Sequence, residues 1–115
     1  LTYPNRMESP IKKLNFWEIK NLTFEKPDAE TFRGLKFAYE AGRIGGTMPC
    51  VFNAANEIAV AAFLAGKIKF LQIYDVIESV MAKRAAVQNP TLEILLAEDA
   101  AARVDAAKLL SVNEC

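Results

Sequence analysis

Residues 49–64, PCVFNAANEIAVAAFL, constrain the fold more than any other part of the chain. The segment is apolar except for Asn53, Asn56 and Glu57, which at spacing i, i+3, i+4 share one face of a helix. A helix that is apolar on nearly all other sides belongs in the middle of a domain. The segment is too short for a membrane span, which needs about 20 apolar residues. It predicts the central helix of a small bundle, with a polar seam of Asn53, Asn56 and Glu57 that needs partners.

Length and composition favour one packed domain. The chain has 115 residues, of which 52% are hydrophobic and 24% charged, so it can build a core and is not typical of disorder. Its 14 basic residues balance 14 acidic ones, which leaves no net field to attract nucleic acid or an anionic membrane. We therefore expect neither nucleic acid nor membrane as a partner.

The numbers of histidine and cysteine residues limit the kinds of catalytic and metal site that the chain can form. The chain has no histidine, the commonest general base and transition-metal ligand. Its two cysteines, Cys50 and Cys115, form no CxxC pair, which argues against a zinc site and favours a reducing cytoplasm, with Cys50 as a small buried apolar residue. No signal peptide is recognisable at the start. The first residue is leucine rather than methionine, and we expect a piece of a longer protein.

The first quarter of the chain does not have the sequence pattern of a helix. Pro4 and Pro10 interrupt it, and the alternation of apolar residues that follows is strongest at residues 22–24, Leu-Thr-Phe. This pattern predicts an extended arm with a short β-strand over residues 1–27, followed by a helical bundle domain over residues 28–115. The arm carries much apolar surface that needs cover, in particular Phe16, Trp17, Leu22 and Phe24.

The rest of the chain predicts a mainly α fold, a small bundle of four main helices. The first begins near Thr31 and ends at the glycines of residues 42–46. Its narrow inward face consists of Leu35, Ala38, Tyr39 and Gly42, with Phe32 and Phe37 nearby. Thr47 is the expected N-cap of the central helix, which ends at Gly66. A third helix over residues 71–84 carries a full amphipathic stripe, made of Ile73, Val76, Ile77, Val80 and Met81.

After the break at Asn89-Pro90, the pattern predicts two shorter helical pieces. Thr91 is the expected cap of the first and Asp99 of the second. In the second piece, Val104, Ala107 and Leu110 are expected to point inward. The charged residues of this region are expected to form an ordinary exposed helix face, made of Glu93, Glu98, Asp99, Arg103 and Asp105.

Few residues suggest a catalytic or ligand-binding role. Glu57, the one acid expected to be buried, is either a tuned acid or metal ligand, or a carboxylate held by donors at a helix junction. The second reading is favoured because no histidine and no second acid lies in the motif. Asn53 and Asn56 either orient a ligand or satisfy loop backbone groups. The GxxGG at residues 42–46 does not match the dinucleotide fingerprint and predicts a helix end and a turn.

Four segments carry a family resemblance: LTYPNR, LNFWEIKNLTFEKPD, LKFAYEAGRIGG and NAANEIAVAAFLAGKI. Together they resemble, in the same order, the carboxy-terminal part of the deoxyxylulose phosphate reductoisomerase family. The resemblance implies an enzyme of the non-mevalonate route to isoprenoids that uses NADPH and Mg²⁺ or Mn²⁺ to convert deoxyxylulose phosphate to methylerythritol phosphate. It also implies a homodimer, each subunit having a Rossmann domain, a catalytic domain, and a linker leading to a carboxy-terminal bundle.

The resemblance covers the linker and the bundle only. The family's nucleotide loop, Asp-x-Glu metal motif, histidine flap and phosphate cluster have no counterpart here, so we assign no catalytic and no metal residue. The resemblance places Leu1 beside the nicotinamide pocket, which makes it the one candidate for cofactor contact. It implies that this chain alone is structural and inactive, and binds neither NADPH nor metal.

Two functions remain open. The chain is either the support domain of a reductoisomerase, with the rest of that enzyme as its partner, or a self-standing helical protein-interaction module. The leucine start and the apolar arm favour the first function. In the absence of a catalytic domain, an uncovered arm is expected to cause self-association.

Overall fold

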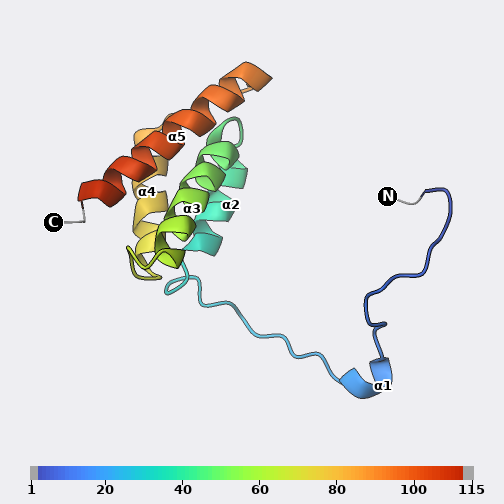
Figure 1. Ribbon diagram of the computed structural model, residues 1–115. Coiled ribbons are helices and arrows are strands. Elements are labelled where there is room, and N and C mark those ends of the chain that lie inside the picture. Colours follow the sequence, from blue (N-terminus) through green and yellow to red (C-terminus); the bar gives the residue numbers. More distant parts are fainter. Residues whose placement is uncertain (1–2, 113–115) are drawn as a thin grey trace.

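The middle of the structure is α3 (Met48–Leu64). The computed structural model describes residues 3–112. The helices α2 (Gly34–Ile44), α4 (Gln72–Lys83) and α5 (Leu92–Val112) all contact α3 (Figure 1). Small side chains on α3 let these neighbours approach closely. Its buried residues are Met48, Val51, Ala54, Ala55, Ala59 and Ala62. The predictions of a mainly helical chain and of a central helix are confirmed.

The amphipathic stripe of α4 is also confirmed. All five predicted residues are buried, and Ile77 and Val80 are among the largest fully buried side chains. Glycine and polar residues in the connection after α3 let the chain reverse, and the Gly66 backbone takes a positive φ of 74° there. One face of α4 therefore packs on α3, as its periodicity indicates.

The inward face of α2 differs from the predicted one. Phe37 and Ala41, spaced i, i+4, are the buried residues, whereas Leu35 and Tyr39 are 42% and 61% exposed. A single phenylalanine with an alanine one turn later is enough to fill the space beside α3 and α4. The other large side chains of α2 are then left on the outside.

The last region is one continuous helix rather than two pieces. Thr91 caps it as predicted, with its Oγ1 accepting a hydrogen bond from the Ile94 N–H at 3.4 Å, but Asp99 lies inside the helix. No glycine or proline follows Pro90, so nothing breaks the helix. The fully buried residues are Ala102 and Ala106. The predicted inner face is wrong for the exposed Val104 and Ala107, whereas Leu110 is partly buried against the core as predicted.

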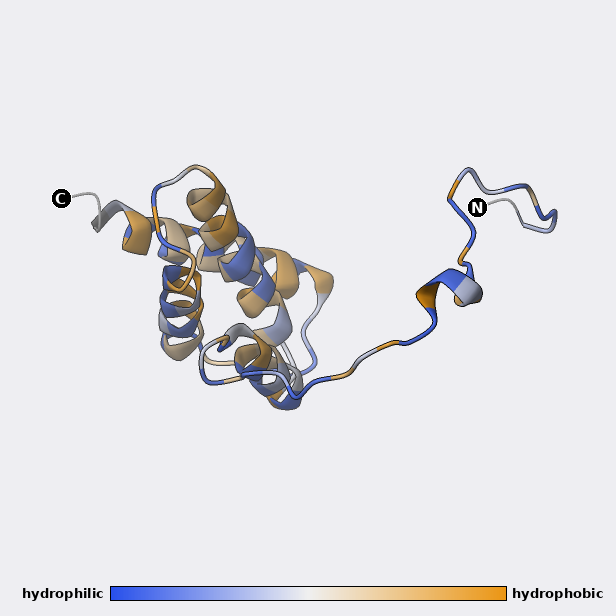
Figure 2. Cartoon of the chain, turned by 90° about the horizontal axis from the view of Figure 1, so that it is seen from below, coloured by the Kyte–Doolittle hydropathy of each residue, from blue (hydrophilic) through white to orange (hydrophobic). Residues whose placement is uncertain are grey.

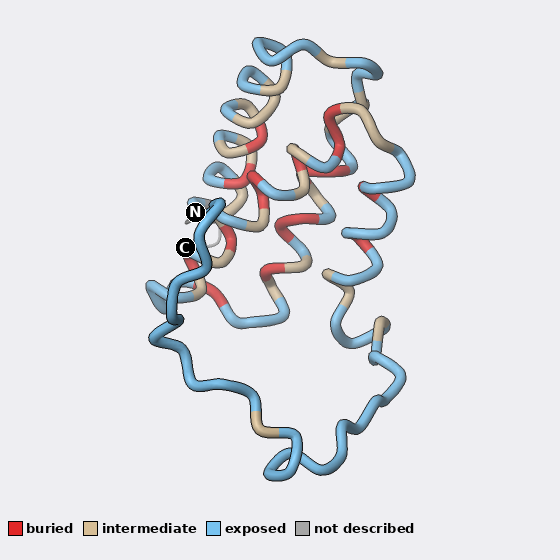
Figure 3. Tube along the Cα trace, turned by 90° about the vertical axis from the view of Figure 1, so that its right-hand side faces the viewer, coloured by how far each residue is buried: buried red, intermediate tan, exposed pale blue. Residues whose placement is uncertain are grey.

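Residues 3–27 form an arm that extends away from the bundle, and residues 28–33 join it to α2 (Figure 1). Its only regular element is the single turn α1 (Phe16–Ile19), which contacts none of the other helices. Buried residues are confined to the bundle in Figure 3, and Figure 2 shows apolar segments of the arm lying apart from it. The predicted short β-strand is not present anywhere in residues 3–112, because a strand needs an adjacent strand for its backbone hydrogen bonds and the arm has no neighbour.

The loop between α2 and α3 and the loop between α4 and α5 contact each other at one end of the bundle. Gly45 ends α2, as predicted, with a φ of 69° and its N–H donating to the Ala41 carbonyl at 3.0 Å. Thr47 is fully buried and pairs with Val87 in the other loop: its N–H donates to the Val87 carbonyl at 3.1 Å, and its Oγ1 accepts from the Val87 N–H at 3.0 Å. Thr47 makes no side-chain cap bond to α3, because its hydroxyl is used to join the loops.

Within residues 3–112, no helix is both long and apolar enough to cross a membrane.

Candidate functional site

The predicted polar seam faces α5 and is not buried. Glu57 Oε2 accepts a hydrogen bond from Arg103 Nη2 at 2.7 Å, and Glu57 Oε1 accepts one from Asn53 Nδ2 at 3.2 Å. The Glu57 side chain is 53% exposed, so the expectation of a buried acid is wrong. Asn53 is exposed as well, and Asn56 is half-buried. The seam joins α3 to α5 through a partner 46 residues away in sequence.

Arg103 donates hydrogen bonds to two carboxylates that lie on different helices. Its Nε donates to Asp99 Oδ2 at 2.7 Å on the same helix, while its Nη2 reaches Glu57 on α3. The hydrogen bond from Arg103, assisted by that from Asn53, lowers the pKa of Glu57. The carboxylates, Asp99 first, raise the pKa of Arg103. A general acid needs a pKa near the working pH, so the lowered pKa of Glu57 favours a structural role.

The lowered pKa of Glu57 predicts how the stability of the fold depends on pH. Because its folded-state pKa lies below the ordinary 4.5, the ion pair stabilises the fold above that value, and this stability is lost as the pH falls through the folded-state pKa. We expect Glu57→Gln to lower the melting temperature near neutral pH and to differ less from the parent at about pH 3. Thermal unfolding followed by circular dichroism from about pH 7 to about pH 3 measures this. A difference that did not change with pH would contradict it.

A second arginine holds the other edge of α5. Arg84, just after α4, donates from Nη1 to Glu98 Oε2 at 2.8 Å and from Nη2 to Asp105 Oδ2 at 2.9 Å. The Arg84 side chain is 18% exposed, and its two partners are 24% and 23% exposed. Burial opposes the charge of Arg84, but the two carboxylates outweigh it and raise its pKa. The expectation of an ordinary exposed face is therefore wrong for Glu98 and Asp105.

A third arginine lies where the arm enters the bundle. Arg33 donates to Asp75 at 2.5 Å and to Glu78 at 2.6 Å, and its guanidinium lies 5.7 Å from the centre of the Phe37 ring. Nearby, the Phe70 ring makes edge-to-face contacts with the rings of Phe32, Phe63 and Tyr74. These contacts fix the direction in which the chain, coming from the arm, enters α2. Arg33 and Arg84 were not singled out from the sequence, and Arg103 was expected only on an exposed face, since nothing in the local sequence indicates partners so distant.

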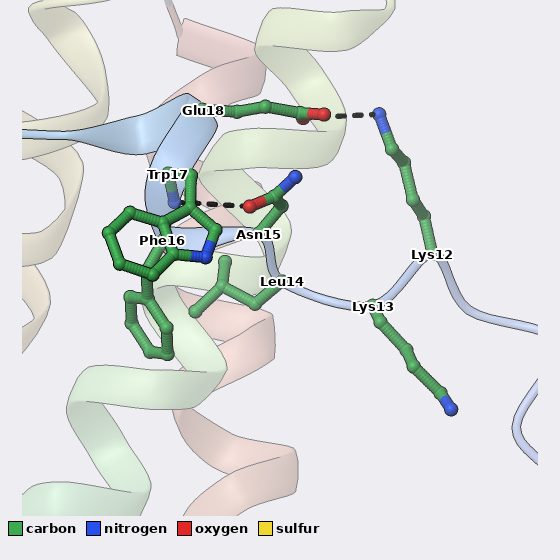
Figure 4. Close-up of a pocket in the computed structure, with 7 residues that line it drawn as sticks. All are labelled: Lys12, Lys13, Leu14, Asn15, Phe16, Trp17 and Glu18. Atoms are coloured by element: carbon green, nitrogen blue, oxygen red, sulfur yellow. Dashed lines mark hydrogen bonds and ion pairs between the residues drawn. The ribbon is translucent and has the colours of Figure 1, made fainter.

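The arm is the candidate interaction surface. Around α1, residues 12–18 enclose a shallow open hollow (Figure 4), in which Asn15 Oδ1 accepts from the Trp17 N–H at 3.1 Å. Lys12 Nζ lies 3.9 Å from Glu18 Oε2, a contact worth little at such an exposed place. Trp17 is 88% exposed and Phe24 is 90% exposed. Apolar groups this open are typical of a segment that docks on another surface.

A metal site would need grouped ligand side chains, and a nucleotide site commonly uses a glycine-rich phosphate loop. Within residues 3–112, no three His, Cys, Asp or Glu side chains are grouped so that they could hold a metal ion. Gly45 and Gly46 serve a turn between two helices, where Gly46 lies against the Val87 backbone. Leu1, the candidate for cofactor contact, lies outside the described residues.

An extended arm followed by a bundle of helices that ion pairs join to one another defines the class of the chain as a small helical domain with an amino-terminal extension. The family model described as "DXP reductoisomerase C-terminal domain" matches residues 1–105, and the chain belongs to this family. The resemblance noted in the sequence is thereby confirmed.

Curated relatives and solved structures agree with the family. The chain is 54% identical over 99 residues to the 1-deoxy-D-xylulose 5-phosphate reductoisomerase of Clostridium botulinum, covering 86% of this chain and 26% of the relative. It is 57% identical over 93 residues to the Bacillus subtilis enzyme, covering 80% and 24%. It also matches the Zymomonas mobilis reductoisomerase solved in complex with NADPH, with a TM-score of 0.81 and 44% identity over 94% of this chain and 29% of that one. The chain spans about a quarter of the length of the curated relatives it matches.

Proposed function

We propose that this chain is the carboxy-terminal linker and bundle of a cytoplasmic, NADPH- and Mg²⁺- or Mn²⁺-dependent 1-deoxy-D-xylulose 5-phosphate reductoisomerase. The enzyme converts its substrate to 2-C-methyl-D-erythritol 4-phosphate in isoprenoid biosynthesis. The observation that carries the proposal is the family match over residues 1–105, together with 54% identity to a reductoisomerase along most of the chain.

In this proposal the arm, residues 1–27, is the linker and residues 28–115 are the bundle domain. The partners are the Rossmann and catalytic parts of the same enzyme, which works as a homodimer. The exposed aromatic side chains of the arm support a docking role, because burying one of them contributes about 1.5–3 kcal/mol. Asn53, Asn56 and Glu57 have a structural role, and Leu1 lies near the nicotinamide in the whole enzyme.

The chain alone is expected to be inactive. The described residues offer neither a metal-ligand group nor a phosphate loop, and so nothing to orient the substrate or NADPH. We expect no NADPH oxidation above background when the purified chain is mixed with 1-deoxy-D-xylulose 5-phosphate and Mg²⁺ or Mn²⁺. A complete reductoisomerase assayed in parallel is the positive control. NADPH oxidation that rose in proportion to the amount of the chain would contradict the proposal.

The uncovered arm is expected to make the chain self-associate. Phe16, Trp17, Leu22 and Phe24 find cover on a second chain when the catalytic domain is absent. Deleting residues 1–26 should abolish the association seen by light scattering at micromolar concentration. Helical circular dichroism should persist, because α1 contacts none of the other helices. A monomeric full chain in which Trp17 fluorescence reports a mobile side chain would show the idea to be wrong.

A further inference from the structure

Residues 32–34, where the chain enters α2, contact α4 and the loop before it. The centre of the Phe32 ring lies 6.4 Å from that of the Phe70 ring, edge to face. A Cβ added at Gly34 would lie 2.9 Å from Tyr74 Cε1, so the Gly34 backbone lies directly against that ring. The chain is therefore packed on a neighbouring helix at the point where α2 begins.

Arg33 adds an ionic contact to this packing. Its Nη2 donates to Asp75 Oδ1 and its Nη1 to Glu78 Oε2, two carboxylates that are three residues apart on one face of α4. The Arg33 side chain is 34% exposed, and an ion pair this open contributes little by itself, so it acts together with the ring contacts. We name residues 32–34 and their partners Phe70, Tyr74, Asp75 and Glu78 the junction clasp.

The turn before the junction clasp is closed by Asp28. Its Oδ1 accepts hydrogen bonds from the Glu30 N–H at 3.2 Å and the Thr31 N–H at 3.0 Å. Its backbone carbonyl accepts a hydrogen bond from the Phe32 N–H at 3.0 Å. The order of α2 therefore extends back to Asp28. In contrast, residues 22–26 are all exposed and lie outside any helix or turn.

We propose that residues 28–34 move with the bundle as one body, and that the arm pivots on residues 22–26. The junction clasp fixes this boundary, because without it the pivot would extend to Gly34. The inference rests on contacts inside this chain and goes beyond the proposed function, so its failure would leave the family membership unaffected. In the proposed enzyme, residues 22–26 are the joint about which the bundle turns relative to the catalytic part, and Arg33 is a positioning residue that limits the turn.

Limited proteolysis of the full chain with a glutamate-specific protease tests the boundary. Glu25 and Glu30 are both exposed but lie on opposite sides of it. Because a protease cuts where the backbone opens, cleavage after Glu25 should be at least about tenfold faster than cleavage after Glu30, as measured by mass spectrometry. The same ratio in a synthetic peptide of residues 20–36, which lacks α4, corrects for the sequence preference of the protease. Equal corrected rates at the two sites would overturn the proposal.

Loosening the junction clasp is the second test. The double variant Asp75→Asn, Glu78→Gln keeps the size of both side chains but removes the charges that hold Arg33. Trypsin cleavage after Arg33, and glutamate-specific cleavage after Glu30, should each become about threefold to tenfold faster. Cleavage after Glu25 should not change, because this residue lies outside the clasp.

Two controls separate the junction from the bundle as a whole. Glu40→Gln removes an exposed carboxylate of α2 that is not a partner of Arg33, and it should leave all of these rates unchanged. Trypsin cleavage after Arg43, in the last turn of α2, reports opening of the bundle. A rise confined to the sites after Arg33 and Glu30 supports the proposal. Unchanged rates in the double variant, or an equal rise after Arg43, would show that the clasp does not fix the boundary.

Discussion

Gly46→Ala is expected to destabilise the bundle by about 3 kcal/mol or more, whereas Gly45→Ala should cost about 1–2 kcal/mol. Both glycines have a positive φ, 56° and 69°, so both variants suffer the strain of a left-handed backbone. Only at Gly46 would the new Cβ meet another atom, the Val87 carbonyl oxygen at 2.3 Å. At Gly45 nothing lies within 4 Å. The difference between the two variants isolates the clash.

The clash has a further consequence. Moving Val87 away would break its two hydrogen bonds with the buried Thr47, each worth about 0.5–1.5 kcal/mol. Urea denaturation followed by circular dichroism gives both free energies of unfolding. Similar midpoints for the two variants would mean that the loops separate easily and that their contact does not support the bundle.

Sequence patterns predicted well where one face of a helix differs sharply from the other. The stripe on α4 identified every buried residue of that helix, and the apolar character of α3 identified the centre of the bundle. The buried residues of α3 are mainly alanines, and the apolar character of the whole segment marked that helix, whereas on α4 the large apolar side chains point to one side. The period of the pattern then reports burial directly.

The same reasoning failed for α5 because its apolar residues lie on two sides. Alanines face α3, since only small side chains allow the helices to approach closely, and Leu96 and Val104 point outward. A rule that turns the larger residues inward therefore selects the wrong face. Likewise, Phe37 rather than Leu35 faces the core on α2, although both lie in one apolar stretch.

The polar seam was found only in part. The spacing of Asn53 and Glu57 on one face was read correctly, and their hydrogen bond exists. The partner that decides their role, Arg103, lies on another helix, and its position depends on how α5 crosses α3. Local sequence carries no signal for such a contact, which is also why the arginine clusters were missed.

Arg84→Ala is expected to lower the free energy of unfolding by about 2–3 kcal/mol, because hydrogen bonds between charged groups each contribute about 1.5–3 kcal/mol and two half-buried carboxylates lose their counter-ion. The neighbouring Lys83→Ala removes the same charge from an exposed position and should stay within about 0.5 kcal/mol of the parent. Thermal and urea unfolding of the two variants give the comparison.

A triple variant distinguishes the effect of removing the arginine cation from the effect of leaving two carboxylates without a counter-ion. Adding Glu98→Gln and Asp105→Asn to Arg84→Ala removes the unpaired charges, and part of the lost stability should return. If the loss came instead from the packing of the arginine side chain, the triple variant would be no more stable than Arg84→Ala. An Arg84→Ala chain as stable as Lys83→Ala would mean that the ion pairs of Arg84 do not contribute to holding α5, which would then depend on its alanine contacts with α3 and on the ion pair between Arg103 and Glu57.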